Sequence, residues 1–131
     1  MKLYVASSIH QAERVARTID FLRKAGFGVE CDWASKYLAE GRNAASAGFN
    51  DEMVEAIRRC DALVLMLPGG RGAHFEFGGA HVSGKKCFVL YDQEEDLISF
   101  ARCTGVVLTK SGMELINLLD DYRRELEQNN G

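Results

Sequence analysis

Apolar residues along this chain of 131 residues alternate between short continuous runs and helical periods. Five runs predict strands, at 2–6, 27–33, 62–68, 86–91 and 105–108. The third run is apolar throughout, which is typical of a strand buried on both faces of a sheet. After the first run, apolar residues recur every three or four positions up to Leu22, which predicts a helix that ends near Gly26.

The remaining connections are less regular. Residues 34–49 show no apolar period and are rich in glycine and alanine. A polar stretch of this length is uncommon in a compact domain unless it is functional or mobile. Asn50 or Asp51 is the expected cap of a helix that runs to about Cys60. A short helix is expected at 97–102, and Ser111 with Glu114 forms a capping box that opens a final helix.

The regular alternation of strand and helix predicts the fold class. We expect one α/β domain over residues 1–131, with a doubly wound, flavodoxin-like, five-stranded parallel sheet and helices on both faces. In such sheets the ligand lies beyond the carboxyl ends of the strands. Candidate binding residues therefore follow the first four strands, at 7–10, 32–33, 68–76 and 92.

Composition narrows the function classes. Apolar residues make up 47% of the chain and charged residues 27%, and the net charge is −3. Without a basic patch, no nucleic-acid partner is expected. The apolar run at the start is too short for a signal peptide or a membrane span, so we expect a cytoplasmic protein without a membrane partner. The four cysteines are scattered without ligand spacing, which indicates reduced thiols and no metal site.

The glycine-rich segment at 69–86, "GGRGAHFEFGGAHVSGKK", leaves the most apolar strand. A dinucleotide fingerprint fits Gly70 and Gly72, but its third position is Phe75 and it follows the third strand instead of the first. A P-loop is excluded because no Gly-Lys-Ser/Thr follows the turn. A glycine turn that opens a helix remains, with backbone N–H groups that bind an anion and Arg71 adding positive charge.

Glu76 stands between two phenylalanines just after this turn. An acidic residue in the first turn of a helix is stabilised by the helix dipole, which needs no catalytic role. Alternatively, the carboxylate performs chemistry in a pocket with an apolar floor. Both explanations of Glu76 stay open. His74 has alternatives as well: it donates a proton to the leaving base, binds a phosphate, or is an ordinary histidine of the turn. Trp33 either stacks on a base at the pocket mouth or packs against the strand that it closes.

The segments "YVASSI", "CDALVLMLPGG" and "GAHFEFGGAHVSGKK" together resemble the nucleoside 2-deoxyribosyltransferase superfamily, which includes N-glycosidases of nucleoside 5′-monophosphates. The resemblance covers residues 2–108. Its most specific part is the pattern G-x-x-x-E-x-G-x-A-x-x-x-G-K. This pattern is met by Gly72, Glu76, Gly78, Ala80, Gly84 and Lys85.

The resemblance implies a set of site residues. Glu76 corresponds to the catalytic nucleophile, and Tyr4 of the first strand is the second catalytic residue. The turn after that strand supplies Ser8, Ile9 and His10, where the monophosphate hydrolases usually have an arginine at the last position. The remaining substrate-binding candidates are Trp33, Gly70, Arg71, Gly72, His74 and Ser99. The serine is one that a subunit lends to its neighbour's site, which implies a homodimer or higher homo-oligomer.

One departure from the family concerns its second carboxylate, an aspartate eight residues before Asp61. Met53 occupies that position here. Asp51, Glu52 and Glu55 lie close by, and a shifted helix start would bring one of them to the same place. The substitution bears on sugar recognition and on proton delivery to the leaving base.

The implied reaction is cleavage or transfer of the N-glycosidic bond of a nucleoside or nucleotide, through a covalent glycosyl-enzyme and without a cofactor. A nucleotide-binding module that has lost the chemistry is an alternative, favoured by Met53. An NAD-cleaving glycohydrolase is a further alternative, although no sequence feature specifically indicates that a dinucleotide binds.

Overall fold

The computed structural model describes residues 1–129. Its elements in chain order are β1 (Lys2–Ala6), η1 (Ile9–Gln11), α1 (Ala12–Lys24), β2 (Gly28–Val29), α2 (Trp33–Glu40), η2 (Gly41–Ala44), α3 (Ala47–Arg59), β3 (Ala62–Met66), α4 (Arg71–Val82), β4 (Lys86–Leu90), η3 (Glu94–Asp96), η4 (Ser99–Arg102), β5 (Val107–Thr109) and α5 (Gly112–Asn129), where η denotes a 3-10 helix.

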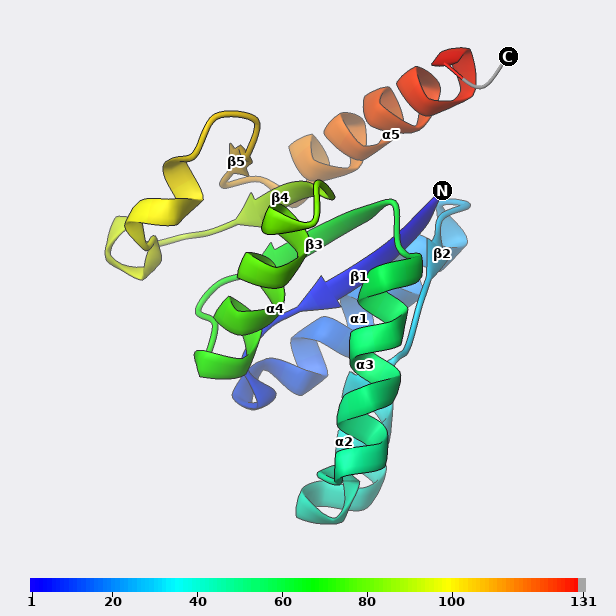
Figure 1. Cartoon of the computed structure of the whole chain (residues 1–131), viewed down its shortest axis with the longest axis vertical. Coiled ribbons are helices and arrows are strands. Elements are labelled where there is room, and N and C mark those ends of the chain that lie inside the picture. The colour runs from blue at the N-terminus through cyan, green and yellow to red at the C-terminus, as the bar shows by residue number, and fades with distance from the viewer. Residues whose placement is uncertain (130–131) are drawn as a thin grey trace.

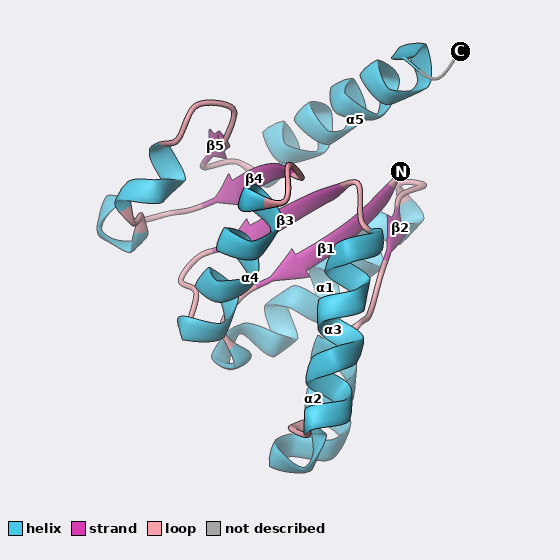
Figure 2. Ribbon diagram, in the orientation of Figure 1, coloured by secondary structure: helices cyan, strands magenta, loops and turns pink. Residues whose placement is uncertain are grey.

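The five strands form one parallel sheet in the order β2-β1-β3-β4-β5, as predicted. The arrowheads of β1, β3 and β4 point to the same edge in Figure 2. Every residue of the central strand β3 is buried, which agrees with its continuous apolar sequence. The chain passes from β1 outward to β2 and returns to the other side of β1 with β3. A crevice is expected beyond the carboxyl ends of β1 and β3, where the direction of winding reverses.

Helices cover both faces of the sheet, so the expected doubly wound α/β class is confirmed. Helices α3 and α4 lie in front of the sheet in Figure 1, and α1 lies behind it. Helix α1 turns an apolar stripe of Val15, Ile19 and Leu22 inward, and α4 buries Ala73, Phe77 and Ala80. Buried residues of the sheet and of these helices make one hydrophobic cluster. No helix among the described residues is long and apolar enough to cross a membrane.

The second strand is much shorter than the predicted range 27–33. Only Gly28 and Val29 pair with β1. Cys31 adopts a left-handed backbone conformation, with φ of 54°, and the chain turns away from the sheet there. The Asp32 side chain then caps α2 by accepting a hydrogen bond from the Ser35 backbone N–H at 3.0 Å. The strand prediction beyond Val29 is wrong because this cap starts a helix.

The segment 34–49 is mostly helical, contrary to the prediction that it lacks regular structure. It contains the remainder of α2, then η2, and the start of α3. Helix α2 buries only Trp33 and Ala34, so it has no apolar period for a sequence pattern to detect. Helix α3 is capped by Ser46, whose Oγ accepts a hydrogen bond from the Phe49 N–H at 3.1 Å. The predicted cap at Asn50 or Asp51 is therefore wrong.

The predicted helix at 97–102 is the 3-10 helix η4, which covers Ser99–Arg102. The capping box at the last helix is half formed. Ser111 Oγ accepts a hydrogen bond from the Glu114 N–H at 3.2 Å, as predicted. The Ser111 N–H donates to Thr109 Oγ1 at 3.2 Å and not to the Glu114 carboxylate.

Candidate active site

Glu76 lies in the second turn of α4, which begins at Arg71 after its cap residue Gly70. The first turn of this helix contains no acidic residue. The favourable interaction of a carboxylate with a helix dipole falls off beyond the first turn. The helix-dipole explanation of Glu76 is therefore wrong, and the carboxylate needs another explanation.

Tyr4 connects Glu76 to the centre of the sheet. The tyrosine hydroxyl donates a hydrogen bond to Glu76 Oε2. Tyr4 is fully buried on β1, between the neighbouring strands. Burial, and then the charge of Glu76, raise the pKa of the phenol well above its usual value. The phenol therefore stays protonated and acts as a fixed donor to the carboxylate.

The Glu76 carboxyl is partly buried, and this burial raises its pKa to about 7. The hydrogen bond from Tyr4 opposes the shift because it stabilises the charged form. Among the described residues, no lysine, arginine or histidine forms an ion pair with Glu76. Near neutral pH both protonation states of the group are therefore populated, and the ionised one is the form that a nucleophile or a general base requires.

A pocket of about 610 Å³ opens beside Glu76, in the crevice expected beyond β1 and β3. It is formed by the turn after β1, the start of α4 and one side of α3. Its lining residues are Ser7, Ser8, Ile9, His10, Trp33, Asn50, Met53, Val54, Gly70, Arg71, Gly72, Ala73, Phe75 and Glu76.

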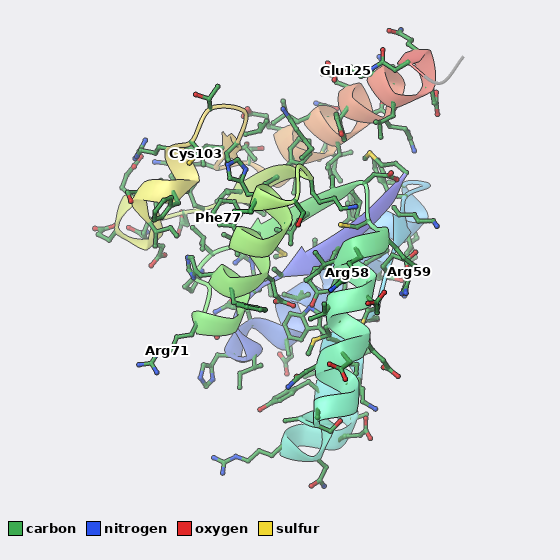
Figure 3. All side chains as sticks on the ribbon, in the orientation of Figure 1. Arg58, Arg59, Arg71, Phe77, Cys103 and Glu125 are labelled. Carbon is green, nitrogen blue, oxygen red and sulfur yellow. The ribbon has the colours of Figure 1, made fainter. Side chains whose placement is uncertain are left out.

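Two turns meet at the glycine-rich end of this pocket. A Cβ atom placed on Gly70 would lie 3.9 Å from Ser8 Oγ, so the turn before α4 contacts the turn after β1. Gly70 caps α4 without a side-chain hydrogen bond, and the first backbone N–H groups of a helix have no partner within it. Arg71 extends from this end of α4 into solvent (Figure 3). The arrangement can bind an anion such as a phosphate.

The wall that α3 contributes is almost uncharged. Asn50, Met53 and Val54 follow one another at helical spacing on the pocket side of α3. The acidic residues of the same helix line a separate cavity with Cys31, Gly48 and Arg59; these acids are Asp51, Glu52 and Glu55. No shift of the helix start brings one of them to the pocket, so the expectation that an acid replaces the missing aspartate is wrong.

Aromatic side chains frame this wall. Trp33 is almost fully buried, and its Nε1 donates to the Val5 carbonyl oxygen at 2.6 Å. The indole thus packs on β1 and also lines the pocket, while its stacking on a base stays a prediction. Phe75 lies at the mouth and is 72% exposed. Phe77 is buried on the opposite side of α4, where its ring stacks with His81 at a centroid distance of 6.2 Å.

Besides Tyr4, two candidate residues do not line the pocket. His74 lies behind the glycine turn, with Nδ1 at 3.0 Å from the Gly70 carbonyl oxygen and Nε2 buried without a hydrogen-bond partner. Ser99 is an exposed residue of η4. The other candidates either line the pocket or, in the case of Tyr4, contact Glu76 from below.

Sequence reasoning missed two lining residues, Asn50 and Val54, whereas Ser7, Ala73 and Phe75 lie within the ranges predicted after the first and third strands. Asn50 and Val54 share a helix face with Met53, so a correct start for α3 would have identified them. Within the described residues, no three His, Cys, Asp or Glu side chains are placed to hold a metal ion.

No protein-family model and no curated protein matches the sequence significantly. Among solved structures, a CMP N-glycosidase from Clostridium botulinum, BcmB, is similar to this chain. The TM-score is 0.60, the sequence identity is 22%, and the alignment covers 92% of this chain and 99% of that protein. At this identity the similarity establishes a shared fold. The fold implied by the sequence resemblance is thereby confirmed, and the neighbour is by name a glycosidase of a nucleoside monophosphate.

Proposed function

We propose that this protein cleaves the N-glycosidic bond of a nucleoside 5′-monophosphate, with Glu76 as the nucleophile. The observation that carries the proposal is the Glu76 carboxyl itself. It is partly buried, its pKa is raised to about 7, and its one hydrogen-bond partner among the described residues is the fully buried Tyr4. A carboxylate held in this way beside a pocket is suited to attack an electrophilic carbon.

In the proposed reaction, a Glu76 oxygen attacks the anomeric carbon C1′ as the bond from C1′ to the base nitrogen breaks. The bonding electrons leave with the base, and a glycosyl ester forms on Glu76. Water then cleaves the ester in a hydrolase, or a second nucleobase does so in a transferase. Tyr4 acts as a positioning residue, because its hydroxyl holds the carboxylate in one orientation.

The glycine-rich end of the pocket favours a 5′-monophosphate over a nucleoside. The uncapped start of α4 and the Arg71 side chain offer donors and positive charge there. The turn after β1 adds the Ser8 hydroxyl and His10, which replaces the arginine usual in the monophosphate hydrolases. The named substrate of BcmB, CMP, is also a nucleoside monophosphate.

Liquid chromatography tests this function directly. The protein is incubated with ribo- and deoxyribonucleosides and their 5′-monophosphates, with and without a second free base. Free base should appear with the native chain and fall by about 10³-fold or more with Glu76→Gln. Glu125→Gln, on the exposed side of α5 far from the pocket (Figure 3), is the matched control and should retain full activity. Full activity of Glu76→Gln would refute the proposal.

A nucleotide-binding module without catalysis is the second candidate. Met53 supports it, because this residue lines the pocket where the superfamily pattern has an acid. Such a module would show a higher melting temperature with a nucleotide, from the mass action of binding, without release of base. Binding together with base release favours the enzyme.

We also propose a cytoplasmic homodimer. All four cysteines are free thiols, which supports a reducing compartment. Phe75 and Val82 are 72% and 86% exposed on one face of α4, which supports a covered interface. Because Ser99 does not line the pocket of its own chain, any role for it in a site requires a second copy.

A further inference from the structure

Among the residues that the structure describes, none on the α3 side of the pocket can give a proton to a leaving base. Its ionisable lining residues are His10, Arg71 and Glu76. The first two belong to the turns that meet at the glycine-rich end. On the other side, Met53 and Val54 have no acidic proton, and an amide such as that of Asn50 does not ionise.

Glu76 cannot supply this proton while it acts as the nucleophile. It attacks as an anion, and an anionic carboxylate only accepts hydrogen bonds. Trp33 is also unavailable, because its N–H is engaged by the Val5 carbonyl oxygen. A neutral base would therefore have to depart from this pocket as an anion, without assistance from a general acid that is commonly worth about 10²–10⁴ in rate.

The same region is suited to a positive charge. Glu76 has no cationic partner among the described residues, and the ring of Phe75 beside it presents a π-face of the kind that attracts cations. Asp51 and Glu52, on the same helix as the α3 wall, form no ion pair within the part of the chain that the structure describes. Their field adds to the attraction.

We propose that the substrate is a nucleoside 5′-monophosphate whose base already carries a positive charge, such as a pyridinium or an N7-alkylated purine. The inference rests on the function proposed above. As the C1′–N bond breaks, its electron pair neutralises the positive ring, and the base leaves without needing a proton. A Glu76 oxygen forms the new bond to C1′, so an anion and a cation become a neutral ester and a neutral base. Water then releases the sugar phosphate, restores the carboxylate and gives one proton to solvent.

Pairs of substrates that differ in the charge of the base test this inference. The first pair is 7-methylguanosine 5′-monophosphate and GMP, and the second is nicotinamide mononucleotide and its reduced, uncharged form. After subtraction of uncatalysed release, kcat/KM should favour the charged member of each pair by about 10²-fold or more. Ratios near one would overturn the inference.

A charged base is a better leaving group than a neutral one in any environment. An acid introduced into the α3 wall therefore tests whether the pocket itself lacks a proton donor. Burial in this wall raises the pKa of a carboxyl, so Met53→Asp places a protonated donor beside the leaving base. Met53→Asp should raise kcat/KM for the neutral substrates, so that the ratio of kcat/KM between the charged and the neutral member of each pair falls by about tenfold or more. Met53→Asn has no acidic proton and should leave this ratio unchanged. Equal narrowing by both variants would overturn the inference. Val54→Asp, at a half-buried position of the same wall, repeats the test against Val54→Asn if Met53→Asp does not fold.

The two proposals fail in different ways. Release of guanine from GMP as fast as release of 7-methylguanine overturns the charge inference alone and leaves glycosidic cleavage standing. If none of these four mononucleotides loses its base but another nucleoside 5′-monophosphate of the chromatography panel does, the charge inference alone falls. If no monophosphate loses its base, both proposals fall.

Discussion

The hydrogen bond from Tyr4 favours the anionic form of Glu76 against the effect of burial, and the titration of this carboxyl should govern the pH dependence of the reaction. The nucleophile must be ionised, and the pKa of this carboxyl is about 7. We therefore expect kcat/KM to fall about tenfold for each pH unit below about 7. In Tyr4→Phe the stabilising donor is lost, the Glu76 pKa rises further, and the acid limb of the profile moves to higher pH.

The control for this profile is Tyr91→Phe, because the Tyr91 hydroxyl also bonds a glutamate, Glu94, but outside the pocket. That variant should keep the native profile. An acid limb that stays in place, or moves to lower pH, in Tyr4→Phe would contradict the role assigned to the tyrosine.

The same carboxyl should make the folded protein less stable as pH rises from acid to neutral. Its pKa is raised from 4.5 to about 7 on folding, so the folded state binds more protons than the unfolded state between these values. The contribution of Glu76 to the free energy of unfolding therefore decreases as pH rises through this window. Glu76→Gln should gain on the order of 2–3 kcal/mol relative to the native chain between pH 4 and pH 8.

Urea denaturation at the two pH values measures this gain. Glu125→Gln serves again as the control and should show no comparable difference between them. A Glu76→Gln variant whose relative stability does not change with pH would mean that the carboxyl is well solvated in the folded protein.

At the scale of elements, α3 carries one wall of the pocket, and its start depends on a single cap. Ser46→Ala removes the hydrogen bond to the Phe49 N–H and should cost about 1 kcal/mol of stability. Because Asn50 and Met53 follow within the next two turns, the same change should also raise KM. Ser111→Ala removes the corresponding cap of α5, which does not line the pocket, and should cost similar stability without changing KM. Equal effects of the two variants on KM would contradict this assignment.

Elements whose buried residues repeat at the period of a strand or a helix could be predicted from the sequence. This holds for β1, β3, β4 and α1. Helix α2 could not be predicted, since it buries only two residues and packs against α1 without a stripe of its own. The extent of β2 depends on the backbone turn at Cys31, which no pattern of polarity indicates.

The candidate site likewise has one part that the sequence predicts and one part that it does not. Glu76 and the glycine turn are adjacent in the sequence and follow a clear strand, so the crevice could be predicted around them. The facing wall is different. Asn50 and Val54 point to the pocket only because Ser46 starts α3 at Ala47, and a helix started at Asn50 or Asp51 leaves Asn50 outside it. A local cap thus determines which chemistry faces the carboxylate.

At the scale of the whole molecule, the outer face of α4 joins the pocket to a prospective interface. Phe75 and Val82 lie two turns apart on this face, with glycines exposed or partly exposed between them. Burial of these side chains against a second copy would remove apolar area from water and place the partner at the pocket mouth.

We therefore expect light scattering to report a dimer of the native chain and a monomer of Val82→Asp. Met113→Asp changes an equally apolar side chain, 70% exposed on α5, and should leave the dimer intact. Because Phe75 lines the pocket, the monomeric variant should also have a higher KM. A native chain that is monomeric at assay concentrations, with unchanged KM in Val82→Asp, would mean that each copy completes its own site.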